Sequence, residues 1–246
     1  MASAMKIRIK FRKYGVMKFI GHLDIMRYFQ KAIRRADIDI SYSGGFSPHM
    51  IMSFAAPLGV GITSDGEYFD IEVNSTKTSE EALAALNNTM VEGVEVSSYV
   101  ALPDNAKTAM SIVAAADYEL SFKDGYEVPA DKATFEAAIA EFFTNAKEVL
   151  ITKQTKKSER TMDLKPLVYE FSMREKEGKP VFYLNLSTGS NDNVKPELVV
   201  EALFTHMGLI YNESAIQIHR IDVYALASDN SSDKFISLGD MGTVIS

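Results

Sequence analysis

The spacing of apolar residues switches between two periods along this chain, and these switches constrain its fold more than any other feature. Residues 6–14, KIRIKFRKY, alternate apolar and basic side chains, which predicts a half-buried strand with a basic outer face. In residues 22–36, HLDIMRYFQKAIRRA, the apolar side chains recur at helical spacing instead. The chain therefore begins with a predicted strand followed by an amphipathic helix.

The first half continues with further strands and a second helix. Strands are predicted over residues 38–42, 50–56, 67–73 and 94–102, and a helix capped by Ser79 over residues 79–90. The order is β-α-β-β-(β)-α-β, which is that of a ferredoxin-like unit.

A similar order follows in the second half. Strands are predicted over residues 110–122, 148–154, 167–175, 180–187 and 215–225, with helices over residues 131–146 and 195–208, the last closed by Gly208. We therefore expect an α+β protein of two tandem ferredoxin-like (βαββαβ) halves with antiparallel sheets. The halves are assigned to residues 5–104 and 108–226, and residues 227–246 are expected to form a flexible tail.

The composition excludes several kinds of chemistry. The 246 residues contain no cysteine, which excludes disulfides, thiol catalysis and cysteine-ligated zinc or iron–sulfur sites. The four histidines do not show metal-binding spacing, so we expect no metal and no cofactor. Neither a membrane-spanning apolar run nor a secretory start is present, and a soluble cytoplasmic protein without membrane contacts is expected.

Basic residues concentrate at one end of the chain. Residues 1–60 contain ten basic and three acidic side chains, although the whole chain has a net charge of −7. On the helix 22–36, four cations fall on one face and form what we call the cationic stripe: Arg27, Lys31, Arg34 and Arg35. Like charges at i,i+4 destabilise a helix slightly, and a bound polyanion would offset that cost. The stripe is compatible with an RNA-binding surface or with a solvated helix face.

The segment YSGGFSPHM, residues 42–50, follows the cationic stripe. Its glycines allow another group to approach the backbone closely. The aromatic side chains are suited to stacking on a base, although Phe46 is equally compatible with plugging the core. The residues of this segment that we predict to bind substrate or RNA are Tyr42, Ser43, Gly45, Phe46, Ser47 and His49.

Three further groups of polar residues have a functional and a structural interpretation. His22, Asp24 and His49 are candidate catalytic residues, but His22 and Asp24 are also compatible with capping and packing at a helix start. Asp70 and Glu72 alternate with apolar residues, which favours a solvated strand face over a carboxylate pair. A secondary basic loop, compatible with a mobile loop or a nucleic-acid contact, contains Lys153, Lys156, Lys157 and Arg160.

Residues 19–73, from FIGHLDIMRYFQKAIRRADIDISYSGGFSPHM to EYFDIEV, closely resemble the radical-SAM-linked protein family, a domain of unknown function. SIVAAADYEL, residues 111–120, is also similar to the family. The positions that match the family pattern are His22, Leu23, Asp24, Met26, Arg27, Arg34, Arg35, Ala36, Tyr42, Ser43, Gly45, Phe46, Pro48, His49, Pro57, Leu58, Gly59, Val60, Glu67, Tyr68 and Asp70.

The resemblance implies a partner rather than an activity. Members occur alone or fused to radical-SAM enzymes with a cobalamin-binding-type domain. Because this sequence has no cysteine for the iron–sulfur cluster, we expect a radical-SAM enzyme on a separate chain as the partner. The leading hypothesis is an accessory protein that binds RNA, such as tRNA or rRNA, or presents the substrate. The alternatives are a metal-independent RNA-processing enzyme using His22 and His49, and a protein-interaction scaffold.

Overall fold

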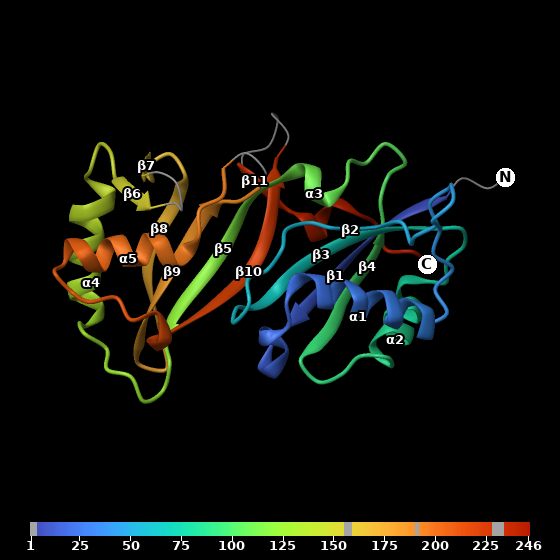
Figure 1. Cartoon of the computed structure of the whole chain (residues 1–246), viewed down its shortest axis with the longest axis horizontal. Helices are drawn as coiled ribbons and strands as arrows, with labels where there is room; N and C mark the ends of the chain where they lie inside the picture. Colours follow the sequence, from blue (N-terminus) through green and yellow to red (C-terminus); the bar gives the residue numbers. More distant parts are fainter. Residues whose placement is uncertain (1–3, 155–158, 190–191, 228–233) are drawn as a thin grey trace. The chain divides into compact units, whose positions relative to one another are not determined.

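The computed structural model describes residues 4–154, 159–189, 192–227 and 234–246. It confirms an α+β fold with antiparallel sheets (Figure 1). The chain forms two compact units. The first unit contains Met1–Ala114 and Asp222–Ser246, and the second contains Ala115–Ile221. No helix in the described part of the chain is both long enough and apolar enough to cross a membrane.

The first unit has the predicted ferredoxin-like element order. Its elements are β1 (Met5–Lys13), α1 (His22–Arg35), β2 (Met52–Phe54), β3 (Thr63–Val73), α2 (Ser79–Asn87) and β4 (Val94–Ala101). The strands lie in the order β4-β1-β3-β2, and each neighbouring pair is antiparallel. The predicted strand at residues 38–42 is reduced to isolated bridges, which join Ile40 to Val73 and Tyr42 to Met50.

The alternation in β1 places its apolar side chains in the core of this unit. Ile7, Ile9 and Phe11 are buried together with Phe29 of α1 and Leu86 of α2. The rings of Phe11 and Phe29 meet edge to face with their centroids 4.6 Å apart. Aromatic contacts of this kind add to the stability gained from apolar burial, so α1 is held firmly against the sheet.

The start of α2 differs from the prediction. Thr78, rather than Ser79, is the N-cap, and it forms a capping box with Glu81. The Thr78 hydroxyl accepts from the Glu81 backbone N–H, while the Glu81 carboxylate accepts from the Thr78 backbone N–H. Ser79 lies one residue inside the helix, where its hydroxyl accepts a hydrogen bond from the Ile245 N–H.

The basic outer face of β1 is covered around Arg8, contrary to the prediction of a solvent-facing surface. Arg8 is only 1% exposed and forms an ion pair with Asp70 of β3. Asp70 also accepts a hydrogen bond from the Ala109 N–H, at the start of the short helix α3 (Ala109–Ile112). The prediction that Asp70 lies on a solvated strand face is therefore wrong, because chain segments distant in sequence cover this face.

Much of this cover comes from the C-terminal segment, residues 234–246, which we expected to belong to a flexible tail. It contains β11 (Phe235–Ser237), which pairs with the end of β10 (Ile216–Leu226), and a 3-10 turn over Leu238–Met241. Leu238 is fully buried, and Thr243 bridges Ala101 of β4. The segment is thus a packed part of the first unit, while residues 228–233 lie outside the described residues.

The second unit repeats the ferredoxin-like order with one insertion. Its main elements are β5 (Val113–Phe122), α4 (Lys132–Ile139), β8 (Val168–Lys176), β9 (Lys179–Ser187), α5 (Pro196–His206) and the first part of β10. A π-helical turn, Ala140–Thr144, follows α4. The strand order is β10-β5-β9-β8. The insertion is a separate hairpin of β6 (Leu150–Gln154) and β7 (Glu159–Asp163).

Candidate functional site

The cationic stripe lies on the side of α1 that faces away from the core. Ile25, Phe29, Ala32 and Ile33 are the buried residues of this helix. The opposite side is exposed at all four cations of the stripe, Arg27, Lys31, Arg34 and Arg35. The helical spacing that predicted the stripe is therefore preserved in the folded chain, and its charged ends are accessible.

The stripe is poorly neutralised by neighbouring carboxylates. Arg27 pairs with Asp24 at 3.4 Å, but both side chains are more than half exposed, and such pairs contribute little. Asp24 also lies in the first turn of α1, where its charge complements the helix dipole. Among the described residues, no carboxylate pairs with the other three cations of the stripe, Lys31, Arg34 and Arg35.

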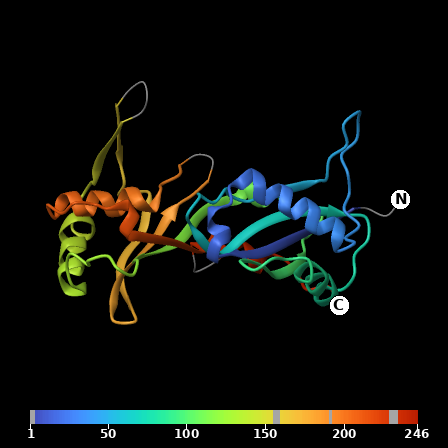
Figure 2. The same cartoon turned by 60° about the horizontal axis from the view of Figure 1, so that its bottom comes forward.

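Residues 42–50, which we call the exposed loop, form a narrow excursion closed at its base. Tyr42 bridges the buried Met50, and the Ser43 N–H donates to the His49 carbonyl at 2.9 Å. The Ser43 hydroxyl lies 2.8 Å from His49 Nδ1 and accepts from the His49 N–H at 3.1 Å. Figure 2 shows the loop projecting away from the sheet and helices around it. These bonds fix the base of the loop.

The exposed loop presents aromatic and polar groups to solvent. Phe46 is fully exposed, so it does not plug the core, and the Tyr42 ring is about half exposed. Gly45 has a φ of +96°, a conformation that disfavours any residue with a Cβ. Ser47 and His49 are also exposed. Exposed aromatic rings of this kind can stack on unpaired bases.

The two candidate catalytic histidines line separate pockets. His22 begins α1 and packs edge to face on Phe54, with the ring centroids 5.4 Å apart. It lines a small pocket with Lys13 and Glu67, whereas His49 lines another pocket with Lys6 and Asp70. Among the described pockets, none contains both imidazoles, so the structure does not bring them together.

Sequence reasoning missed the burial of the groups beside His22. Lys13 is 2% exposed and Glu67 is 4% exposed, and Lys13 Nζ donates to the Ile20 carbonyl at 3.0 Å. Burial, followed by the nearby positive charge of Lys13, lowers the pKa of His22 below its usual value. The sequence does contain a signal of this burial at position 13. The alternation of β1 predicts an apolar, inward-facing residue there, and the chain has a lysine instead. The lowered pKa favours the neutral form of His22 in the folded protein.

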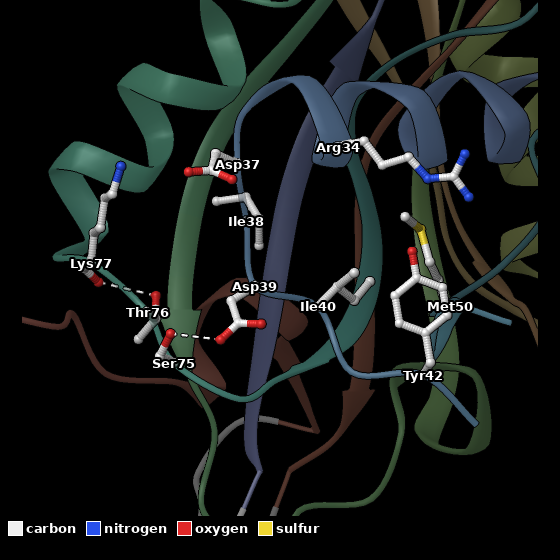
Figure 3. Close-up of a pocket in the computed structure, with 10 residues that line it drawn as sticks. All are labelled: Arg34, Asp37, Ile38, Asp39, Ile40, Tyr42, Met50, Ser75, Thr76 and Lys77. Carbon is white, nitrogen blue, oxygen red and sulfur yellow. Dashed lines mark hydrogen bonds between the residues drawn. The ribbon is translucent and has the colours of Figure 1, made fainter. Parts of the chain in front are cut away.

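Two of the predicted binding residues, Arg34 and Tyr42, meet at a larger pocket of about 570 Å³ (Figure 3). We call it the α1 pocket. Its other lining residues come from the turn after α1, from Met50 and from the segment after β3: Asp37, Ile38, Asp39, Ile40, Met50, Ser75, Thr76 and Lys77. The two segments are joined by the bridge between Ile40 and Val73, a contact that local periodicity cannot reveal.

The secondary basic loop lies in the second unit, in the β6–β7 hairpin. The register pairs Lys153 with Arg160, which places both residues near the end of the hairpin. The side chains of these two residues, and the whole of Lys156 and Lys157, lie outside the described residues. A nucleic-acid contact at this loop stays a prediction.

A family model matches most of the chain. The model of a family described as "Uncharacterized protein conserved in bacteria (DUF2344)" matches residues 6–196. No curated protein matches.

Two solved structures are similar to the chain only distantly. A chain from the crystal structure of a Cbf5-Nop10-Gar1 complex has a TM-score of 0.43 at 10% identity; the match covers 88% of this chain and 48% of that chain. The crystal structure of an unknown protein from Galdieria sulphuraria has a TM-score of 0.24 at 12% identity. That match covers 90% of this chain and 99% of the other chain. Both TM-scores are too low to assign a fold or a function from these structures.

Proposed function

The chain belongs to the family of uncharacterized proteins conserved in bacteria (DUF2344), and we propose that it binds single-stranded RNA through α1 and the exposed loop. One observation carries this proposal. Lys31, Arg34 and Arg35 are exposed without a carboxylate partner in the described structure, and the next segment of the chain exposes Tyr42 and Phe46. Unpaired cations and accessible aromatic rings are the two components of a single-strand binding surface.

The two components have different roles in binding. The cations contact phosphates and supply most of the affinity, which falls as salt is added because releasing counterions into a more concentrated salt solution gains less entropy. The rings of Tyr42 and Phe46 stack on unpaired bases. Double-stranded RNA does not offer such bases, because its bases are paired and stacked on one another. The chain has a net charge of −7, so this local concentration of positive charge, rather than the overall charge, attracts the polyanion.

The resemblance of residues 19–73 to radical-SAM-linked proteins suggests a role for the bound RNA. We infer that the chain is an accessory protein that presents RNA to a radical-SAM enzyme. Its 246 residues contain no cysteine. The cysteines that hold the iron–sulfur cluster of the radical-SAM enzyme must therefore lie outside this sequence.

An exposed apolar group at the start of α1 supports such a partner. Val16, Phe19, Leu23 and Val60 are all strongly exposed. The Gly61 N–H donates to the Lys18 carbonyl at 2.8 Å, which holds the loop that carries Val60 next to the segment that carries Phe19. Exposed apolar groups with polar surroundings are typical of protein-docking surfaces. We assign this group to the enzyme partner, because the RNA-binding cations lie further along the same helix.

The proposal is tested by binding of a labelled single-stranded RNA at low salt. Arg34→Glu combined with Arg35→Glu reverses two charges of the stripe and is expected to weaken binding by about tenfold or more. Lys147→Glu combined with Lys176→Glu changes the net charge equally at exposed residues of the second unit, and is expected to leave binding nearly unchanged. Equal effects of the two double variants would show that only the overall charge matters, and would refute the proposed surface.

A further inference from the structure

The α1 pocket combines groups of opposite charge around an apolar floor. Ile38, Ile40 and Met50 supply the apolar part, and Met50 and Ile40 are buried beneath it. Figure 3 places the carboxylates of Asp37 and Asp39 between Lys77 on one side and Arg34 with Tyr42 on the other. A volume of about 570 Å³ lies in the range of pockets that hold a small ligand or one unit of a polymer.

Some polar groups of the pocket already have hydrogen-bond partners within the protein. Asp39 accepts hydrogen bonds from Asn74 at 3.0 Å and from the Ser75 hydroxyl at 2.7 Å, and these bonds lower the pKa of Asp39. The Thr76 hydroxyl lies 3.0 Å from the Lys77 carbonyl and 2.9 Å from the Tyr99 hydroxyl. These contacts organise the wall of the pocket and leave those groups little capacity for a ligand.

Four side chains of the pocket have polar groups without such partners. Within the described residues, the side chains of Arg34, Asp37, Tyr42 and Lys77 make no hydrogen bond or ion pair with the protein. Two are cations that attract anionic groups, one is a carboxylate that only accepts hydrogen bonds, and one carries an aromatic ring. A ligand that satisfies all four must combine negative charge, hydroxyl donors and a flat apolar surface.

Asp37 occupies a position where a glycine is usual. It follows the C-cap of α1 with a φ of +55°, and the Ile38 N–H donates to the Ile33 carbonyl in the manner of a Schellman motif. Aspartate tolerates this conformation less well than glycine does. The chain therefore presents an unpaired carboxylate between two cations at a position where glycine would fit the backbone better.

We propose that the α1 pocket binds one nucleotide of a single-stranded RNA and recognises its ribose 2′-hydroxyl through Asp37, an inference that rests on the proposed RNA-binding function. Arg34 and Lys77 bind the phosphates on either side of that nucleotide, and its base lies on the ring of Tyr42. The 2′-hydroxyl donates to the Asp37 carboxylate. A phosphate has no proton to donate to the Asp37 carboxylate, so the hydroxyl is the group that this carboxylate recognises. DNA lacks the 2′-hydroxyl, and the pocket therefore selects RNA over DNA.

The test compares a labelled single-stranded RNA with the 2′-deoxy strand of the same base sequence, using fluorescence anisotropy. The protein is expected to bind RNA about tenfold more tightly, as one hydrogen bond to a carboxylate permits. Asp37→Gly should reduce this ratio to about one without weakening DNA binding, because it removes the acceptor and a negative charge together. Asp37→Asn removes the charge but keeps an acceptor oxygen, so it should retain a preference for RNA.

The outcomes separate the pocket from the wider function. If Asp37→Gly and Asp37→Asn raise the affinity for RNA and DNA equally and leave the ratio unchanged, Asp37 acts only through its charge and the pocket proposal is wrong. If the unmodified protein binds RNA and DNA equally, and Arg34→Glu with Arg35→Glu weakens both, the proposed function stands and the pocket proposal falls. If neither strand binds at low salt, both proposals fail. Lys31→Gln, on the stripe but outside the pocket, should weaken both strands alike and leave the ratio intact.

Discussion

Arg8 and Asp70 form a buried ion pair across neighbouring strands, with Arg8 Nε 2.8 Å from Asp70 Oδ1 and Arg8 Nη2 3.0 Å from Asp70 Oδ2. The two residues are opposite one another in the β1–β3 register. Arg8 Nη1 also donates to the Leu238 carbonyl at 3.3 Å, which ties the C-terminal segment to the sheet. The pair is therefore part of the structure of the first unit and is not available to bind RNA.

Removing one member of this pair should destabilise the protein strongly. Asp70→Asn leaves the Arg8 guanidinium buried without a countercharge, and we expect a loss of about 3–5 kcal/mol in the free energy of unfolding. Urea unfolding measures the loss. The matched control is Asp24→Asn, which breaks the exposed pair with Arg27 and should cost at most about 1 kcal/mol. Similar losses in the two variants would contradict the description of the Arg8–Asp70 pair as buried.

The C-terminal segment should contribute measurably to stability. Leu238→Ala creates a cavity at a fully buried position, and a loss of about 2–5 kcal/mol is expected. Val244→Ala, at an exposed position of the same segment, should change stability by less than about 0.5 kcal/mol. A Leu238→Ala variant with unchanged thermal and urea unfolding would show that the segment is loose in solution.

Asp37→Gly should stabilise the protein even though it removes a side chain. Glycine adopts the positive φ of this position without strain, but it also loses more entropy on folding, so the expected net gain is about 0.5 kcal/mol. Thermal unfolding monitored by circular dichroism measures the gain. A loss of stability would mean that the Asp37 carboxylate makes a stabilising contact within the protein, which would weaken its assignment to a ligand.

His22 should make stability depend on pH. Its folded pKa lies below the ordinary value of 6.5, so the unfolded chain binds a proton more readily than the folded chain does. The stability from this group is complete above pH 6.5 and decreases as the pH falls toward the folded pKa. We expect the loss of unfolding free energy between about pH 7.5 and about pH 5.5 to be smaller in His22→Gln than in the unmodified protein. An equal loss in both would show that His22 is not responsible.

The fold was predictable from the sequence wherever a local pattern determines the structure. The alternation in residues 6–14 and the helical spacing in residues 22–36 predict β1 and α1 correctly, because each pattern reflects burial of one face. What covers the other face of β1 was not predictable. Asp222 accepts from Lys10 at 3.0 Å, and Leu238 accepts from Arg8, but both lie more than 200 residues away in the sequence.

The candidate site shows the same division. Helical spacing placed the four cations of the stripe on one face, and the exposed loop was evident from its glycines and proline. The α1 pocket was not predictable from local patterns. Lys77 comes to line the same pocket as Arg34 and Tyr42 because Ile40 pairs with Val73, which brings the two segments together. The unpaired carboxylate of Asp37 was also missed, since a positive φ at an aspartate is not visible in the sequence.

The salt dependence of RNA binding tests the central claim most directly. The logarithm of the association constant should fall linearly with the logarithm of salt concentration, by about 0.7 for each phosphate contact with a single strand. Arg34→Gln combined with Arg35→Gln removes two contacts, so the slope should become shallower by about 1.4. The same slope in the variant and the unmodified protein would show that these cations do not contact phosphates, and would contradict an RNA-binding surface on α1.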